Sequence, residues 1–387
     1  MKKVEEEEEE EEEGGFRKSL HSLVYRAGLY PSTVAYVGGS AMDVTVATYA
    51  RGNGRSAVKF SDDFRLCKTL QGHTGKIYSL DWAYQAEDRI VSASGDGRLI
   101  VWNALTSQKT HAIKLPCPWV MACAFSPRGR SVACGGLDNM CSIFNLSSPP
   151  DADGNLPVSQ TLSGHKSYLS CCRYVPHSDN NIITSSGDET CILWDVDRSQ
   201  KISTFGGEAT SGHTAAVMSV SVSTVSTPQV FVSGSCDKTA RLWDTRMKSA
   251  PQTYQGHDGD VNAVCFLPDG KRFGTASDDG TCRLFDTRTG YQLQMYSHPR
   301  GDSVKVLAVA FSSSGRLMFA AYDNEDCYVW DTIMSEVVTN LAEHRHGHEK
   351  RISCLGLSRD GSALCTGSWD NTLKVETTIF NDFLSLT

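Results

Sequence analysis

The sequence predicts an all-β fold in which repeated four-stranded sheets are arranged radially, as in a β-propeller. Three observations support this prediction. A Gly-His pair recurs along the chain, an Asp and an aromatic residue follow it at a nearly fixed interval, and turn residues separate short β-branched runs. A Gly-His pair and a closing aromatic residue that recur together indicate that one supersecondary unit is repeated many times. The repeat region is therefore expected to form a single domain.

The repeat unit begins at a Gly-His pair and ends at an aromatic residue that is Trp in most units. The Gly-His histidines are His73, His165, His213, His257 and His348. The closing aromatic residues are Trp102, Phe144, Trp194, Trp243, Phe285 and Trp330. Successive closing residues lie 42, 50, 49, 42 and 45 positions apart. This spacing is typical of WD40 repeats, in which four strands form one blade of a propeller.

Five of the six units that end in an aromatic residue also carry an Asp six residues before it. These acids are Asp96, Asp188, Asp237 and Asp279, with Asp138 in a unit that lacks Gly-His and Asp370 in the last unit. A histidine ring, a strand hydroxyl such as that of Ser92, the turn Asp and the Trp indole can form one buried hydrogen-bond chain. We expect a structural role, because a catalytic Ser-His-Asp triad is needed once whereas this set recurs.

Composition favours a cytoplasmic protein without a cofactor, a metal site or enzymatic activity. The chain has 387 residues, of which 40% are hydrophobic, and contains neither an apolar run of 18 residues nor a basic-then-apolar start. Its fourteen cysteines include no C-x-x-C pair, which predicts reduced core residues rather than zinc ligands or a secreted disulfide framework. Alternation of His344, His346 and His348 does not by itself assemble a tetrahedral metal site.

The acidic charge is concentrated in one run near the N-terminus. Removing Glu5–Glu13 leaves 45 − 9 = 36 acidic against 37 basic residues, so the rest of the chain is nearly neutral. Nothing in the sequence of the repeat region forms the basic stripe that nucleic-acid binding requires. Residues 1–63 are predicted to be a largely disordered acidic extension, or alternatively an acidic interaction segment, and residues 64–387 to be the propeller.

From about Arg65 to Val375, the chain resembles the β subunits of heterotrimeric G proteins, of the plant type. The resemblance rests on phrases specific to single blades: GHTGKIYSLDW at 72–82, PWVMACAFSP at 118–127 and ACGGLDNMCSIFNL at 133–146. Further phrases are YLSCCRY at 168–174, GDETCILWD at 187–195, GSCDKTARLWD at 234–244, SDDGTCRLFD at 277–286 and RISCLGLSRDGSALCTGSWD at 351–370. The segment GGEATSGH at 206–213 is similar to the plant-type spacer.

This resemblance implies a seven-bladed, non-enzymatic partner that holds a GDP-bound α subunit on its narrow face and a γ subunit along its side. After release from α, the same face would engage effectors, and membrane association would come only through lipidated partners at the inner face of the plasma membrane. The positions that match the family's α and effector contacts are Lys76, Tyr78, Trp119, Met121, Leu137, Asn139, Tyr168, Met218, Asp260, Asn262, Asp278 and Trp369.

Two alternatives remain beside these expectations. On their own chemistry, Trp119, Met121, Tyr168 and Trp369 could equally be core residues. A generic WD40 scaffold, such as a substrate receptor of a ubiquitin ligase, would use the same face without binding α or γ.

Both ends of the chain depart from the family pattern. Residues 1–63 contain no heptads from which to build the family's coiled coil with γ. At the other end the chain diverges after residue 375, and Glu376 stands where the last blade should present its Trp. That blade is expected to take its outer strand from Phe64–Gln71, and Phe380 could replace the missing aromatic residue through a bulge. A variant transcript or an incorrectly assembled gene would explain both departures equally.

Overall fold

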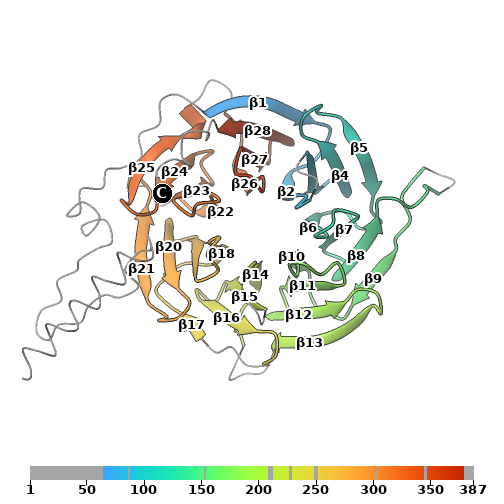
Figure 1. Cartoon of the computed structure of the whole chain (residues 1–387), viewed down its shortest axis with the longest axis horizontal. Helices are drawn as coiled ribbons and strands as arrows, with labels where there is room; N and C mark the ends of the chain where they lie inside the picture. The colour runs from blue at the N-terminus through green and yellow to red at the C-terminus, as the bar shows by residue number, and fades with distance from the viewer. Residues whose placement is uncertain are drawn as a thin grey trace, which may run out of the picture.

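A computed structural model describes residues 64–378, apart from 86–87, 152–153, 208–211, 226–228, 248–251, 302–303 and 344–346. Seven antiparallel four-stranded sheets are arranged in a ring (Figure 1). The predicted seven-bladed WD40 propeller is therefore confirmed. The predicted acidic extension, the alternating His344 and His346, and Phe380 lie outside the described residues.

In the first six sheets, the strands follow one another along the chain from the centre of the ring outward (Figure 1). The first sheet contains β2 (Ile77–Trp82), β3 (Arg89–Ser94), β4 (Arg98–Asn103) and β5 (Lys109–Lys114). The second contains β6 (Val120–Phe125), β7 (Ser131–Gly136), β8 (Met140–Asn145) and β9 (Gln160–Ser163). The third contains β10 (Leu169–Tyr174), β11 (Asn181–Ser186), β12 (Thr190–Asp195) and β13 (Gln200–Gly206).

The next three sheets repeat this order. The fourth contains β14 (Val217–Val222), β15 (Val230–Ser235), β16 (Ala240–Asp244) and β17 (Gln252–Tyr254). The fifth contains β18 (Val261–Phe266), β19 (Arg272–Ser277), β20 (Thr281–Asp286) and β21 (Gln292–Ser297). The sixth contains β22 (Val306–Phe311), β23 (Leu317–Tyr322), β24 (Cys327–Asp331) and β25 (Glu336–Asn340), followed by the 3-10 helix η1 (Leu341–Glu343). No helix among the described residues is long and apolar enough to cross a membrane.

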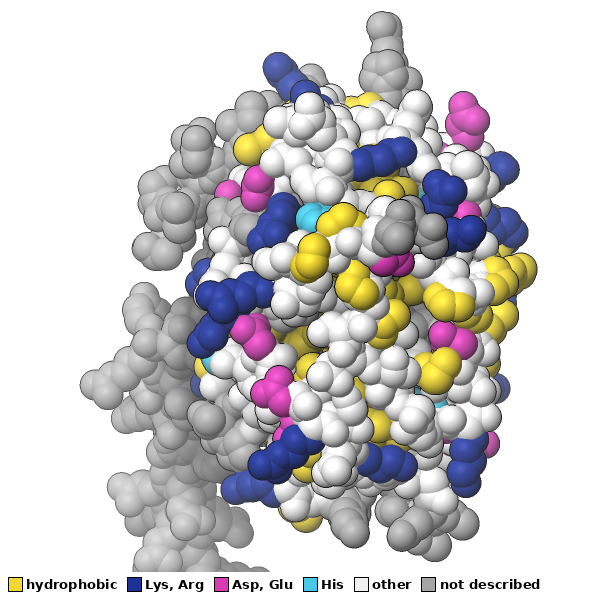
Figure 2. All heavy atoms as spheres, turned by 90° about the vertical axis from the view of Figure 1, so that its right-hand side faces the viewer, with side chains coloured by type: hydrophobic (Ala, Val, Ile, Leu, Met, Phe, Trp, Pro, Cys, Tyr) yellow, Lys and Arg dark blue, Asp and Glu magenta, His cyan; other side chains and the backbone are white. Residues whose placement is uncertain are grey.

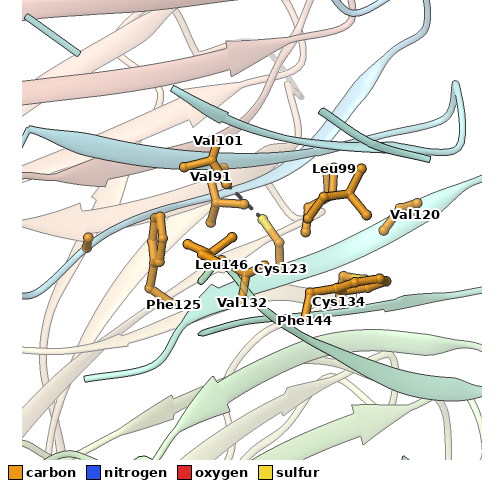
Figure 3. Close-up of a cluster of buried hydrophobic side chains, with 13 residues drawn as sticks. Val91, Leu99, Val101, Val120, Cys123, Phe125, Val132, Cys134, Phe144 and Leu146 are labelled. Atoms are coloured by element: carbon orange, nitrogen blue, oxygen red, sulfur yellow. Dashed lines mark hydrogen bonds between the residues drawn. The ribbon is translucent and has the colours of Figure 1, made fainter. Parts of the chain in front are cut away.

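Apolar side chains fill the layers between neighbouring sheets. Between the first and second sheets, for example, Val91 and Val101 pack together with Phe125, Val132 and Phe144 (Figure 3). Such a layer removes apolar surface from water, at roughly 25 cal/mol per Å². Because each sheet contributes to the layers on both of its sides, the ring is stable only when every sheet has two neighbours.

The cysteines only partly match the expectation that they are core residues. Nine of the fourteen are buried, and all fourteen are free thiols. Cys67 is exposed, while Cys117, Cys171, Cys236 and Cys265 are half-buried. The exposed thiol lies on an outer strand, where side chains on one face of the sheet edge meet solvent rather than a neighbouring sheet.

The seventh sheet is completed by strands from both ends of the described chain. It contains β26 (Ile352–Leu357), β27 (Ala363–Ser368), β28 (Thr372–Thr378) and, as its outer strand, β1 (Phe64–Gln71). The strands β1 and β28 pair antiparallel, with a register shift between Leu66 and Lys68. This pairing covers the hydrogen-bonding edge of β28, which would otherwise be free to pair with another chain.

Glu376 occupies the position in β28 that a tryptophan fills in other sheets. It pairs with Leu364, just as Trp102 pairs with Ile90 in the first sheet. One of its carboxylate oxygens, Oε2, is buried without a hydrogen-bond partner among the described residues. Burial raises the pKa of Glu376 to about 7, although the nearby Lys374 opposes the shift. Near neutral pH the seventh sheet therefore contains a poorly solvated carboxylate.

This pKa predicts that the protein loses stability as pH rises towards neutrality. The folded-state pKa of Glu376 lies above its ordinary value of 4.5, so the group favours the folded state fully below about pH 4.5 and loses that contribution as pH rises through about 7. The loss should be at most about 3 kcal/mol. Urea unfolding at pH 5.5 and at pH 8 should show it as a difference between the wild type and Glu376→Gln.

The glutamine variant is the control, because other titrating groups affect both proteins equally. Among these, His213 has a pKa lowered by burial, which gives a pH dependence of the opposite sign. If the free energy of unfolding changed with pH equally in the two proteins, ionisation of Glu376 would not destabilise the folded state, and the prediction would be wrong.

Candidate protein-binding face

A buried hydrogen-bond network ties together the loops at one end of five sheets: the first, third, fourth, fifth and seventh. In the first sheet, His73 Nδ1 lies 3.0 Å from Asp96 Oδ2, and His73 Nε2 lies 2.7 Å from Ser92 Oγ. Trp102 Nε1 completes the chain by donating to Ser92 Oγ at 2.8 Å. The predicted sharing of polar groups among His, hydroxyl, Asp and Trp is therefore present in this sheet.

The same arrangement recurs around the ring with two variations. The complete sets are His165 with Asp188, Thr184 and Trp194, and His213 with Asp237, Ser233 and Trp243. The sets without an indole are His257 with Asp279 and Thr275, and His348 with Asp370 and Thr366. In these two sheets Phe285 and Glu376 take the place of the tryptophan, so the hydroxyl receives no indole hydrogen bond.

The network holds the loop before each inner strand against the turn between the second and third strands. Asp96 accepts hydrogen bonds from the backbone amides of Thr74 and Arg98, both at 2.9 Å. Burial acts to raise the pKa of Asp96, but the hydrogen bonds from His73 and Thr74 outweigh it and lower the pKa to about 2. The carboxylate is therefore ionised at neutral pH, and its charge-assisted hydrogen bonds fix both loops.

The sixth sheet uses a different polar set, which the sequence analysis missed. His298 is buried against the rings of Tyr322 and Tyr328, with centroid separations of 4.9 and 5.3 Å. Its Nε2 lies 3.5 Å from Asp326 Oδ2, and Asp326 also accepts a hydrogen bond of 2.8 Å from Asn340. The residue before His298 is Ser rather than Gly, so His298 does not match the Gly-His pattern. The spacing to the closing Trp330 could have indicated it.

The twelve predicted contact residues all lie at this same end of their sheets. In an antiparallel sheet the start of the first strand lies beside the turn between the second and third strands. Residues at or near the start of a first strand are Lys76, Tyr78, Trp119, Met121, Tyr168, Met218, Asp260 and Asn262. Residues in a second-to-third turn are Leu137, Asn139, Asp278 and Trp369. We call the side of the ring formed by these residues the anchor face.

Three aromatic side chains from three different sheets meet on the anchor face. The ring of Tyr78 stacks on Trp119 with centroids 6.3 Å apart, and its edge meets Trp369 at 6.0 Å. Two cations contact the ring of Trp369: Lys76 Nζ is 3.8 Å and Arg351 Cζ is 4.3 Å from its centroid. We call Tyr78, Trp119 and Trp369 the aromatic cluster. The aromatic cluster joins the first, second and seventh sheets at the end of the ring that forms the anchor face.

Trp119 is held in an unusual backbone conformation. Its φ angle is +71°, in the left-handed region that bulky side chains rarely adopt. The conformation brings its carbonyl oxygen so close to Gly136 that a Cβ on Gly136 would lie 2.1 Å away, so only glycine fits there. Backbone strain of this kind costs on the order of 1–3 kcal/mol and is concentrated at functional sites. In this protein it holds a tryptophan side chain that is 50% exposed.

None of the twelve residues is fully buried. Lys76, Trp119 and Leu137 are exposed, and the other nine are half-buried. The alternative that Trp119, Met121, Tyr168 and Trp369 form part of the core is therefore wrong for Trp119 and does not describe the other three, whose side chains keep contact with solvent. Sequence alone could not separate these cases, because an exposed anchor and a core residue have the same side-chain chemistry.

The remaining residues of the anchor face extend it with polar contacts. Tyr168 Oη donates to Met218 Sδ at 3.9 Å, which links the third and fourth sheets. Asn262 Nδ2 donates to Asp278 Oδ1 at 2.7 Å, and Asp278 also forms an ion pair with Lys305. Asp260 lies close to the thiol of Cys236, whose pKa is raised to about 12 by burial and by that carboxylate. One side of the anchor face is therefore aromatic and cationic, and the other is acidic.

An aromatic cluster with one exposed and two half-buried rings, held on a ring of repeats, is typical of propellers that bind proteins. The pattern of G protein beta WD-40 repeat proteins matches residues 37–377. The guanine nucleotide-binding protein subunit beta of Nicotiana tabacum is 64% identical over 338 residues, covering 86% of this chain and 90% of the relative. The corresponding subunit of Arabidopsis thaliana is also 64% identical over 338 residues, covering 86% and 89%. The chain therefore belongs to the family of G protein β subunits.

A third relative extends this result. The guanine nucleotide-binding protein subunit beta of Oryza sativa subsp. japonica is 63% identical over 340 residues, covering 86% of this chain and 89% of the relative. The predicted resemblance to plant β subunits is confirmed, and the family match begins at residue 37, upstream of the Arg65 that the blade phrases indicated. Membership of this signalling family favours the G protein function over a generic WD40 scaffold.

The half-buried position of Trp369 predicts that its removal costs much less stability than removal of a network tryptophan. Trp369→Ala should lower the free energy of unfolding by less than about 2 kcal/mol, since it loses two cation–π contacts and one ring contact. Trp102→Ala should lower it by about 3–5 kcal/mol, because Trp102 is 1% exposed and donates a buried hydrogen bond. Denaturant unfolding of both variants checks this difference, and equal losses would place Trp369 in the core.

Proposed function

We propose that this chain is the β subunit of a heterotrimeric G protein that binds a GDP-bound α subunit through the anchor face. After α is released, effectors bind the same face, and a γ subunit binds along the side of the ring. The observation that carries this proposal is the aromatic cluster, in which a strained and exposed Trp119 is stacked on Tyr78.

The anchor face has the composition of a protein interface. Stable interfaces combine a few aromatic anchors with a charged rim, and the anchors contribute most of the binding free energy. Here Lys76 contacts Trp369 of the aromatic cluster, and Asp260 and Asp278 lie farther round the anchor face, on the fifth sheet. Stacking limits the motion of the exposed rings before any partner binds, which reduces the entropy lost on association.

Trp369 has an unused hydrogen-bond donor. Its Nε1 is buried and has no acceptor among the described residues. An unpaired buried donor costs roughly 1–3 kcal/mol. Because Nε1 is not accessible in this conformation, a partner oxygen pairs with it only if the Trp369 side chain shifts on binding.

The proposals of a γ subunit and of a cellular location rest on the family rather than on the anchor face. We expect the protein in the cytoplasm and at the inner face of the plasma membrane, where lipidated partners would hold it. The family match reaches back to residue 37 and so includes part of the segment before β1, although residues 1–63 contain no heptads for a coiled coil with γ. Co-expression with a γ subunit and a GDP-bound α subunit tests this assembly, since a generic WD40 scaffold would co-purify with neither.

Truncation of the central anchor should weaken binding of the α subunit. Trp369→Ala should raise the Kd for the GDP-bound α subunit by about 30-fold or more, equivalent to over 2 kcal/mol, because it removes an interface anchor. Titration calorimetry with the purified α subunit measures this change. Tyr291→Ala is the matched control: Tyr291 is 57% exposed but lies in the loop between β20 and β21, at the other end of its sheet. Equal effects of the two variants would contradict the assignment of the anchor face.

The rim charge should act differently from the anchor. Lys76→Ala should weaken binding less than Trp369→Ala, and the loss should shrink as salt increases, because a rim charge mainly steers association. Association rates measured by surface plasmon resonance at about 0.05 M and about 0.5 M salt test this expectation. A loss that is independent of salt would show that Lys76 acts only by supporting Trp369.

A further inference from the structure

Five exposed cations lie on the outermost strand of the seventh sheet and the two outermost strands of the first sheet. Arg65 and Lys68 lie on β1, Lys109 and Lys114 lie on β5, and Arg98 begins β4; all five are exposed. We call them the basic rim. The strands β1 and β5 are neighbours on the circumference of the ring, and Figure 2 shows Lys and Arg side chains on the side that carries β5. Neither strand contains an Asp or Glu.

The fold brings these cations together although they are scattered in the sequence. A Cβ on Gly72, the residue after β1, would lie 2.0 Å from Lys109 Nζ, so the ammonium group reaches the end of β1. Arg98 and Lys114 are paired in register on adjacent strands. Like charges placed directly opposite in a sheet repel each other, and a bound anion would relieve this repulsion.

The basic rim also lacks the carboxylates that accompany other cations of the ring. Arg246 pairs with Asp244, Arg288 with Asp286 and Arg128 with Asp179. Among the residues that the structure describes, none of the five rim cations forms an ion pair. Their summed field is therefore free to attract an acidic polypeptide.

We propose that the run Glu5–Glu13 of the same chain docks on the basic rim. The run supplies nine consecutive carboxylates, while the rest of the chain is nearly neutral, so no other segment matches the rim in charge. Docking pairs the exposed cations of the rim with carboxylates and needs no defined backbone conformation in the acidic run. While docked, the run shields the rim from other acidic polypeptides.

The length of the chain permits this contact. Residues 14–63 separate the acidic run from Phe64, which makes 63 − 13 = 50 residues. A chain of this length spans at most about 165 Å, far more than the rim requires. The connecting segment enters the ring at β1, which itself carries two of the five cations, so the tether raises the local concentration of glutamate beside the rim.

Zero-length carbodiimide coupling of the full chain tests the proposal directly. Trypsin releases residues 4–17 as one peptide, which carries all nine glutamates and no other acidic side chain. This peptide should be coupled to Lys68, Lys109 and Lys114 at least about fivefold more than to Lys201. Lys201 is the internal control, since it is an exposed lysine on the outer strand β13 of a distant sheet. The excess should disappear at about 0.5 M salt.

Two variants and a dilution series separate the possible outcomes. Replacing Glu5–Glu13 with Gln leaves Asp62 and Asp63 beside β1 unchanged and should raise acetylation of the three rim lysines but not of Lys201. In the coupling experiment, Lys109→Gln combined with Lys114→Gln should lower coupling to Lys68, whereas Lys201→Gln should not. Coupling as strong to Lys201 as to the rim would overturn the proposal. Coupling that rises with protein concentration would also overturn it, because the run would then bind a second copy.

Discussion

The pairing of β1 with β28 joins the two ends of the described chain, and the other sheets depend on it because each one is stabilised by both of its neighbours. A ring without this strand would expose the edge of β28 and the apolar layers on either side of the seventh sheet. The seventh sheet, which closes the ring, also carries the least favourable replacement of a network tryptophan. Glu376 places a carboxylate where other sheets have an indole, and Thr366 consequently lacks the donor that Ser92 receives from Trp102.

The same repeated network that stabilises the sheets also shapes the anchor face. Each ionised Asp holds the loop before an inner strand against a neighbouring turn, so the side chains on those loops have little freedom to move. On this rigid support the chain presents Tyr78, Trp119 and Trp369, although burying them would remove apolar surface from water. The incomplete burial of these three rings and the left-handed backbone of Trp119 lower the stability of the isolated protein. Under the proposed function, association with a partner would be the physical reason for keeping them.

Much of the fold could be predicted from the sequence because each repeat is defined by the local spacing of a histidine, an aspartate and an aromatic residue. The interval from His73 to Trp102, with Asp96 between them, is enough to predict a blade and its hydrogen-bond network. The Gly-His pattern did not predict the polar set of the sixth sheet. There His298 follows a serine, and its ring contacts two tyrosines. A different polar set there forms the same kind of sheet.

Features that depend on contacts between sheets could not be predicted in the same way. The aromatic cluster joins residues 78, 119 and 369, and its exposure depends on how three sheets meet. Likewise, the sequence of the repeat region contains no basic stripe, yet ring closure places β1 beside β5 and so creates the basic rim. The family resemblance identified the residues of the anchor face, but the structure was needed to show that they lie on one side of the ring.

Hydrogen–deuterium exchange with and without the GDP-bound α subunit tests the central claim, that the anchor face of a closed ring binds this partner. The account predicts protection at the starts of β2, β6 and β26 and in the turn that contains Trp369. It predicts unchanged exchange in the loops at the opposite ends of the sheets, such as that between β20 and β21. Protection confined to those opposite loops, or none anywhere in the ring, would contradict it.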